Sequence, residues 1–215
     1  MTEPARNRIG IRLATPDDAE GIRRVYLPFI NTPVTFEEEE PAPDAFRRTM
    51  EGILAFYPGL VAYRTDGAAG DPGEPERIIG YAYAHRQAKR AAYDWNAELS
   101  IYLAPDARRT GIGSALYEAL LALLPLQGIR CAYARVTLPN AGSERLHARF
   151  GFSTMGVQRN AGFKSGAWRD VAWYTLPVGA FDAKPERPVP FPLALSAHAR
   201  EVEDILRRAN DRLRA

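Results

Sequence analysis

The 215-residue sequence has little of what marks several large classes of protein. Its single cysteine, Cys131, excludes an internal disulfide framework and a multi-cysteine zinc site, and its apolar neighbours predict a buried thiol. No apolar run is long enough to span a bilayer, and residues 1–8 lack the apolar core of a signal peptide. The net charge is only +2, which gives no electrostatic reason to expect nucleic acid or a membrane as a partner. We therefore expect a cytoplasmic globular protein.

The order of strand and helix patterns predicts one α/β (α+β) domain. Residues 9–13 alternate as in a strand, and residues 15–18 give the capping residue, proline and acids of a helix start. The other predicted strands are 60–63, 78–85, 99–103, 130–138, 152–157 and 168–176; the helices are 44–57, 114–124 and 142–150; 34–36 is a short extended piece and 65–77 an exposed loop. This order predicts a mixed, mostly antiparallel sheet flanked by helices.

The composition changes after Pro177. Residues 184–193 contain four prolines, which is typical of an extended linker. In residues 196–213 the apolar side chains recur along one helical face. We predict a main domain over 1–181 and, over 182–215, a proline-rich linker with a C-terminal amphipathic helix that packs on the domain or on a partner.

The most informative segment is Arg-Arg-Thr-Gly-Ile-Gly at 108–113, between a predicted strand and a predicted helix. Its glycines allow a tight turn and let a ligand approach the backbone. Backbone N–H groups at the positive end of the following helix suit a pyrophosphate, and Arg108 and Arg109 add charge for its oxygens. A plain strand-to-helix turn would also use glycine, so the residues alone leave both interpretations open. The segment is neither a Walker loop nor a dinucleotide fingerprint.

The Arg/Gln-x-x-Gly-x-Gly/Ala pattern of this segment resembles the coenzyme A signature of the GNAT acetyltransferase superfamily. Leu-Pro-Asn-Ala-Gly-Ser at 138–143 and Arg-Phe-Gly-Phe at 149–152 resemble the second half of that fold. Further segments resemble the phosphinothricin N-acetyltransferases, whose relatives acetylate methionine sulfoximine and methionine sulfone: Asn-Thr-Pro-Val-Thr-Phe (31–36), Ala-Tyr-Asp-Trp-Asn-Ala-Glu (92–98), Asn-Ala-Gly-Phe-Lys (160–164) and Trp-Arg-Asp-Val (168–171). The resemblance runs from about residue 9 to residue 177 and leaves out the C-terminal tail.

The resemblance implies a GNAT-type fold that uses acetyl-CoA as co-substrate, needs no metal and forms a homodimer. The residues expected at the coenzyme are Ser100, Ile101, Tyr102, Arg108, Arg109, Thr110, Gly111, Ile112, Gly113, Asn140 and Ser143. The resembled fold splays its sheet after Glu98. A backbone N–H group in residues 99–102 is therefore expected to stabilise the charge that develops on the thioester oxygen.

Glu98 is the candidate general base. A substrate ammonium must lose a proton before it can form an amide, and a carboxylate within reach can accept that proton directly or through water. Glu98 matches the glutamate proposed as the base in the resembled family. From the residues alone, the alternative is a strand-end glutamate that faces solvent.

His147 is the second candidate catalytic residue. It shares a predicted helix face with Asn140 and Ser143, at i, i+3 and i+7, and this polar stripe could line the coenzyme channel. The resemblance suggests a general acid or a member of a proton relay, as in the phosphinothricin family. The alternative is a histidine that is simply hydrogen-bonded at the helix surface.

The candidate substrate-binding residues are Phe36, Arg86, Lys89, Arg90 and Tyr93. Arginine is the natural bidentate partner of an amino-acid carboxylate, and Arg90 matches an arginine that recurs in the resembled family, although the neighbouring residues 86–89 depart from its pattern. Phe36 and Tyr93 could form apolar walls. Residues 160–164 are expected to form a polar loop that closes the pocket, with Lys164 either at an anionic substrate group or in solvent.

These observations predict an acetyl-CoA-dependent N-acetyltransferase acting on the amine of a small amino-acid-like substrate, of the phosphinothricin, methionine sulfoximine or methionine sulfone type. One alternative is a GNAT enzyme for another amine, such as a polyamine, an aminoglycoside or a protein N-terminus. The other alternative is a non-catalytic acyl-CoA-binding sensor module that acts through its C-terminal helix.

Overall fold

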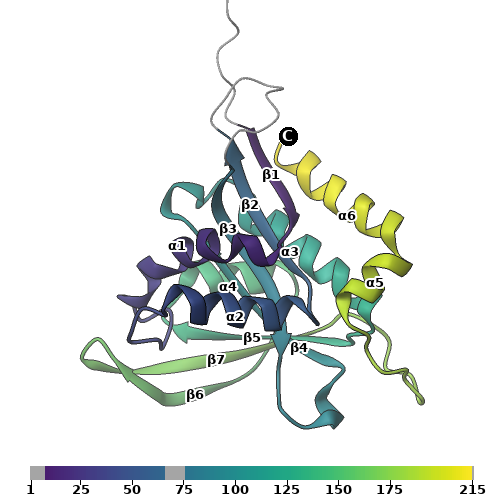
Figure 1. Ribbon diagram of the computed structural model, residues 1–215. Coiled ribbons are helices and arrows are strands. Elements are labelled where there is room, and N and C mark those ends of the chain that lie inside the picture. The colour runs from purple at the N-terminus through teal and green to yellow at the C-terminus, as the bar shows by residue number, and fades with distance from the viewer. Residues whose placement is uncertain (1–7, 66–75, 215) are drawn as a thin grey trace, which may run out of the picture.

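A computed structural model describes residues 8–65 and 76–214 of the chain. Seven strands form one sheet in the order β1-β2-β3-β4-β5-β7-β6, and neighbouring strands are antiparallel except β4 and β5 (Figure 1). The strands are β1 Arg8–Leu13, β2 Gly59–Thr65, β3 Arg77–Arg86, β4 Asn96–Leu103, β5 Cys131–Leu138, β6 Ser153–Lys164 and β7 Ala167–Pro177. The helices are α1 Ala19–Ile30, α2 Pro43–Leu54, α3 Ile112–Leu123, α4 Ala141–Arg149, α5 Phe191–Ala197 and α6 Ala199–Arg212.

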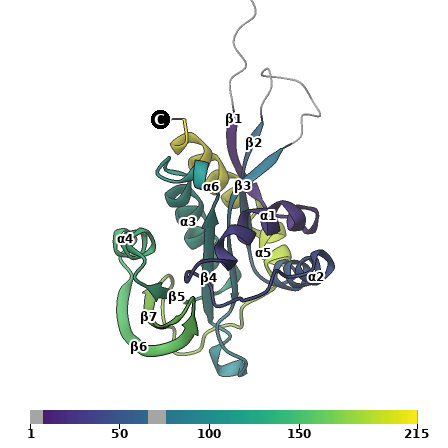
Figure 2. The same cartoon turned by 90° about the vertical axis from the view of Figure 1, so that its left-hand side faces the viewer.

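The predicted mixed sheet flanked by helices is confirmed. Helix α1 packs against β3 and β4 and against α2, whereas α3 packs on β2, β3 and β4 from the opposite face (Figure 2). The apolar side chains accordingly form two clusters, a small one beneath α1 and α2 and a large one beneath α3. Cys131 is buried, as predicted. Among the helices that the structure describes, none is long and apolar enough to cross a membrane.

Several local predictions were wrong. Residues 34–36 lie in a turn rather than in an extended piece, and α2 ends at Leu54, before the predicted residue 57. Residues 160–164 form the end of β6 instead of a loop, because β7 supplies a backbone partner for them: Gly162 pairs with Arg169 and Lys164 with Ala167. The polar, glycine-bearing sequence gives no sign of this pairing. The register shifts between Gln158 and Gly162, before the paired residues. Most of the predicted loop 65–77 lies outside the described residues.

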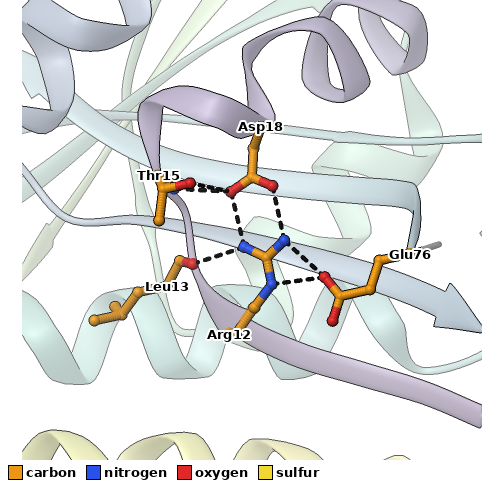
Figure 3. A network of polar contacts seen from close by, with 5 residues as sticks. All are labelled: Arg12, Leu13, Thr15, Asp18 and Glu76. Atoms are coloured by element: carbon orange, nitrogen blue, oxygen red, sulfur yellow. Dashed lines mark hydrogen bonds and ion pairs between the residues drawn. The ribbon is translucent and has the colours of Figure 1, made fainter. Parts of the chain in front are cut away.

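The connection from β1 to α1 is fixed by a compact ion-pair network (Figure 3). Thr15 and Asp18 form a capping box around a single 3₁₀ turn, Pro16–Asp18, and α1 follows at once. The Arg12 guanidinium donates to both Asp18 oxygens at 2.8 and 2.7 Å, and its Nε donates to Glu76 at 2.8 Å. The predicted helix start is therefore present, and the bidentate pair fixes the angle at which α1 leaves the sheet.

The C-terminal tail contains two helices where the sequence predicted one. Helix α6 packs on α3 and β1, and its buried residues Val202, Ile205 and Ala209 belong to the same apolar cluster as the core of α3 (Figure 1). The Asn210 side chain accepts from the Ile11 backbone N–H at 2.8 Å and donates to the Ile11 carbonyl at 2.9 Å. Asn210 thus caps backbone groups on the outer side of the edge strand β1. The predicted boundary at residue 181 stays a prediction.

Candidate functional site

A cleft of about 1240 Å³ opens where two central strands separate. Strands β4 and β5 pair only at their beginnings, through Asn96–Cys131, Ala97–Ala132 and Glu98–Tyr133. Beyond Glu98, no strand among the described residues pairs with β4 on its β5 side, so backbone polar groups of β4 are free to face a ligand. The sheet is therefore splayed at the position where the resembled fold was expected to open.

The two sides of this opening carry different residues. Successive strand residues point to opposite faces, so Glu98, Ser100 and Tyr102 share one face. Tyr102 contacts the rings of Tyr26 and Phe29, which places this face beneath α1. The alternate residues Leu99, Ile101 and Leu103 lie on the α3 side, together with the turn that precedes α3.

The turn at 108–113 forms the wall of the cleft at the N-terminus of α3. Gly111 is the N-cap residue and has a φ of 86°, a left-handed conformation that favours glycine, and a Cβ atom at this position would meet no protein atom within 4 Å. Arg108, Arg109, Gly111 and Gly113 all line the cleft. The charges of the two arginines, together with the free N–H groups at the start of α3, fit a pyrophosphate.

Two predicted coenzyme residues in this turn point elsewhere. The Thr110 hydroxyl donates to the Ala107 carbonyl at 2.7 Å, and Ile112 is buried in the core beneath α3. Their side chains stabilise the turn, and only their backbone groups are available to a ligand. The other predicted coenzyme residues, Ser100, Ile101, Tyr102, Asn140 and Ser143, line the cleft.

The polar stripe on α4 is present and more tightly bonded than predicted. The Asn140 side chain caps the helix by accepting from the Ser143 N–H at 3.2 Å. His147 is buried rather than at the helix surface, and its Nδ1 lies 2.7 Å from the Ser143 carbonyl oxygen. Its Nε2 lies 2.9 Å from the Tyr117 hydroxyl. A carbonyl only accepts, so Nδ1 carries the hydrogen and Nε2 accepts from Tyr117. Burial lowers the pKa of His147, which keeps the imidazole neutral.

Glu98 lies within β4, not at a strand end in solvent. Only 8% of its side chain is exposed, and its Oε1 accepts from Arg135 Nε at 2.6 Å. His85 is its direct partner on β3 and also lines the cleft. Burial lowers the pKa of His85, although the Glu98 carboxylate acts in the opposite direction. Arg135, His85 and Glu98 thus form a polar cluster where the sheet opens.

Sequence reasoning missed Arg135 and His85. The signal for Arg135 was a single charged residue in the middle of Cys-Ala-Tyr-Ala-Arg-Val-Thr-Leu, an otherwise largely apolar strand. An arginine in a largely apolar central strand marks a polar position on that strand, and a carboxylate is its natural partner. The sequence holds too many carboxylates for that partner to be identified without the strand order.

Of the five predicted substrate-binding residues, only Phe36 lines the cleft. It packs across Gly162 of β6, where a Cβ atom would come within 2.7 Å of the Phe36 ring. Arg86, Lys89, Arg90 and Tyr93 do not line the cleft, because they lie at the end of β3 and in the connection that leaves the sheet before β4. Arg86 instead forms an ion pair with Asp94 at 2.7 Å.

Lys164 takes neither of its two predicted roles. It is buried, and its ammonium group donates to the Thr35 carbonyl at 2.6 Å and to the Glu37 carbonyl. Thr35 and Glu37 line the cleft, so the tip of the β6–β7 hairpin holds the α1–α2 connection against the site. Burial lowers the pKa of Lys164.

Known proteins are similar to this chain in both sequence and fold. Residues 11–173 match the family model of the acetyltransferase (GNAT) domain. A phosphinothricin N-acetyltransferase of Streptomyces coelicolor is 33% identical over 180 residues, which cover 81% of this chain and 99% of that protein. An L-methionine sulfoximine/L-methionine sulfone acetyltransferase of Pseudomonas paraeruginosa is 30% identical over 168 residues, covering 77% and 92%. The crystal structure of a phosphinothricin acetyltransferase from Sinorhizobium meliloti in complex with AcCoA is similar with a TM-score of 0.75 and 33% identity, covering 84% and 95%.

Proposed function

The chain belongs to the GNAT acetyltransferase family, and we propose that it transfers the acetyl group of acetyl-CoA to the amine of a small amino-acid-like substrate. The observation that carries the proposal is the position of the Glu98 carboxylate. This carboxylate is buried at the point where β4 and β5 part, within the same cleft as the arginine and glycine turn. A base and an anion-binding turn in one cleft are what amide formation from a coenzyme thioester needs.

Acetyl-CoA supplies the activated acetyl group, and three parts of the chain are suited to hold it: the turn at 108–113, strand β4 and the start of α4. The turn at 108–113 offers its pyrophosphate two arginines and the N-terminus of α3. Ser100, Ile101 and Tyr102 of β4, with Asn140 and Ser143 of α4, line the channel that leads from this turn to Glu98. We infer that a backbone N–H group of β4 beyond Glu98, where β5 no longer pairs with it, stabilises negative charge on the thioester oxygen.

Glu98 acts as the general base. Its Oε1 accepts a hydrogen bond from Arg135 Nε at 2.6 Å, and the carboxylate takes the proton from the substrate ammonium. The deprotonated amine then has the lone pair that it needs to attack the acetyl carbon.

His147 takes part in a proton relay instead of acting alone as a general acid. Both of its nitrogens are bonded, and its Nδ1 lies 3.3 Å from the Ser143 hydroxyl, which lines the cleft. We therefore infer that the Ser143 hydroxyl donates to the departing thiolate and that the Nδ1–H of His147 stabilises the Ser143 oxygen.

The substrate class is an amino acid or an analogue. Relatives that act on phosphinothricin, methionine sulfoximine and methionine sulfone support it. The assignment of Arg86, Lys89, Arg90 and Tyr93 to substrate binding stays a prediction, as does a cytoplasmic location.

The test is thiol release from acetyl-CoA with a panel of amines: phosphinothricin, methionine sulfoximine, methionine sulfone, the common amino acids, spermidine and an aminoglycoside. We expect turnover with members of the amino-acid group and none with spermidine. Turnover with spermidine or the aminoglycoside alone would contradict the substrate class. Acetyl-CoA binding with no turnover of any amine would favour the non-catalytic sensor module.

A homodimer is part of the proposal, and the β6–β7 hairpin supports it. Strand β6 is an edge strand, and Met155, Val157, Phe163 and Trp168 on this hairpin are exposed. Exposed apolar side chains gathered on an edge strand are typical of an interface. Sedimentation equilibrium should give twice the monomer mass for the wild type and the monomer mass for a Met155→Glu/Trp168→Glu variant. A monomeric wild-type protein would contradict the prediction.

A further inference from the structure

On the face of the cleft beneath α1 and α2, a carboxylate and a guanidinium group lie side by side. Glu98 of β4 and Arg135 of β5 point to this face and are joined by the 2.6 Å bond between Glu98 Oε1 and Arg135 Nε. The guanidinium carbon lies 5.3 Å from the centre of the Trp173 ring, which fixes its plane. About half of the Arg135 side chain remains exposed to the cleft.

Arg135 keeps donors for a ligand. A guanidinium has five N–H donors, and the bond to Glu98 uses only the one on Nε. Within residues 8–65 and 76–214, the two terminal nitrogens of Arg135 have no acceptor. They form the planar fork that binds a carboxylate through two parallel hydrogen bonds.

The opposite side of Glu98 carries an acceptor rather than a second cation. His85 Nδ1 lies 3.3 Å from the Arg86 carbonyl oxygen, so it carries the hydrogen and Nε2 keeps its lone pair. A neutral imidazole beside Glu98 accepts from an ammonium group without repelling it. Glu37, from the α1–α2 connection, adds negative charge to the same wall.

We propose that Arg135 binds the α-carboxylate of the substrate and thereby delivers the α-amine to Glu98. An α-amino acid carries an ammonium and a carboxylate on one carbon, and Glu98 with Arg135 presents the complementary pair on neighbouring strands. A polyamine would place positive charge against Arg135, and a peptide N-terminus has no carboxylate at the required position. Arg135 is then a specificity-determining residue, and the substrate is a free α-amino acid.

This proposal rests on the proposed function, and it is tested by comparing an amino acid with its own amide. The amino acid is the best substrate of the panel, and its α-carboxamide has the same side chain but no negative charge. Arg135→Gln should raise KM for the acid about 10- to 100-fold, the range for losing charge-assisted hydrogen bonds, and change KM for the amide less than about threefold. The Kd for acetyl-CoA should not change. Arg24→Gln, a change at an exposed arginine on α1, is the matched control and should alter neither KM.

Two outcomes would overturn the assignment. An equal loss for acid and amide would mean that Arg135 acts only through Glu98. A KM effect for the acid in Arg90→Gln and none in Arg135→Gln would place the carboxylate at the β3–β4 connection. Calorimetric binding of the amino acid without turnover separates this proposal from the proposed function. If the wild type binds the acid and Arg135→Gln does not, the site stands even where acetylation fails; if the wild type binds no amino acid, both are wrong.

Discussion

At the scale of single residues, the proposed chemistry depends on Glu98. Glu98→Gln keeps the shape and the hydrogen bond to Arg135 but cannot accept a proton. We expect kcat near neutral pH to fall about 100-fold or more, the usual contribution of a general base, with the Kd for acetyl-CoA unchanged. The defect should narrow as pH rises, because the substrate amine then loses its proton to water. A variant with wild-type turnover at every pH would refute the general-base assignment.

His147 links the site to stability. Burial lowers its pKa, so below the ordinary value of about 6.5 the unfolded chain binds a proton that the folded protein excludes. This contribution to stability is complete above about pH 6.5 and is lost as pH falls below it. Between pH 7.5 and 5.5, urea unfolding should show a larger loss of free energy for the wild type than for His147→Gln. Equal losses would mean that folding does not lower the pKa of His147.

The site residues that could be predicted from the sequence are those that belong to short local motifs. Glu98, the arginine and glycine turn and the α4 stripe follow from short segments, and the structure places them in one cleft. Arg135 and Lys164 could not be assigned, because their partners come from other strands and loops: Glu98 lies 37 residues from Arg135, and Thr35 lies 129 residues from Lys164. Only the strand order brings such partners together.

At the scale of elements, the proposed coenzyme binding depends on the turn before α3. Gly111→Val places a β-branched residue at φ 86° and points its side chain into open space in the cleft. We expect at least a 10-fold rise in the Kd for acetyl-CoA and a melting temperature lowered only slightly, since a left-handed residue costs about 1–2 kcal/mol. Gly151→Val is the matched control, because Gly151 has φ 79°, equally open surroundings and no place in the cleft. Equal coenzyme affinity in both variants would contradict the assignment.

The α1–α2 connection depends on the β6–β7 hairpin. Lys164→Met removes the ammonium group that binds the Thr35 and Glu37 carbonyls and leaves Phe36 without this support. We expect about a 10-fold rise in KM for the amine, an unchanged Kd for acetyl-CoA and a loss of about 1–3 kcal/mol in stability. Lys184→Met, at an exposed lysine in the tail, should change none of these. A rise in the coenzyme Kd alone would show that the hairpin supports the other half of the cleft.

Element types were predictable because they follow from local periodicity, whereas their ends were not. The strand predicted at 9–13 and the helix predicted at 114–124 are confirmed as β1 and α3. Residues 160–164 failed because pairing with β7, not intrinsic preference, makes them a strand. The splay of β4 and β5 likewise does not follow from local periodicity, and only the family resemblance implied it.

At the scale of the whole molecule, the tail decides whether the chain unfolds as one unit. Ile205 of α6 is buried in the cluster that also contains the core of α3, so the two parts share one core. Ile205→Ala should lower the free energy of unfolding by about 2–5 kcal/mol. We expect a single calorimetric transition at a lower temperature than in the wild type, because the lost packing destabilises the sheet as well as α6. Glu203→Ala, an exposed change on the same helix, should shift it by less than about 0.5 kcal/mol. Two separate transitions, with the larger one at the wild-type temperature, would instead show that residues 182–215 unfold independently of the sheet.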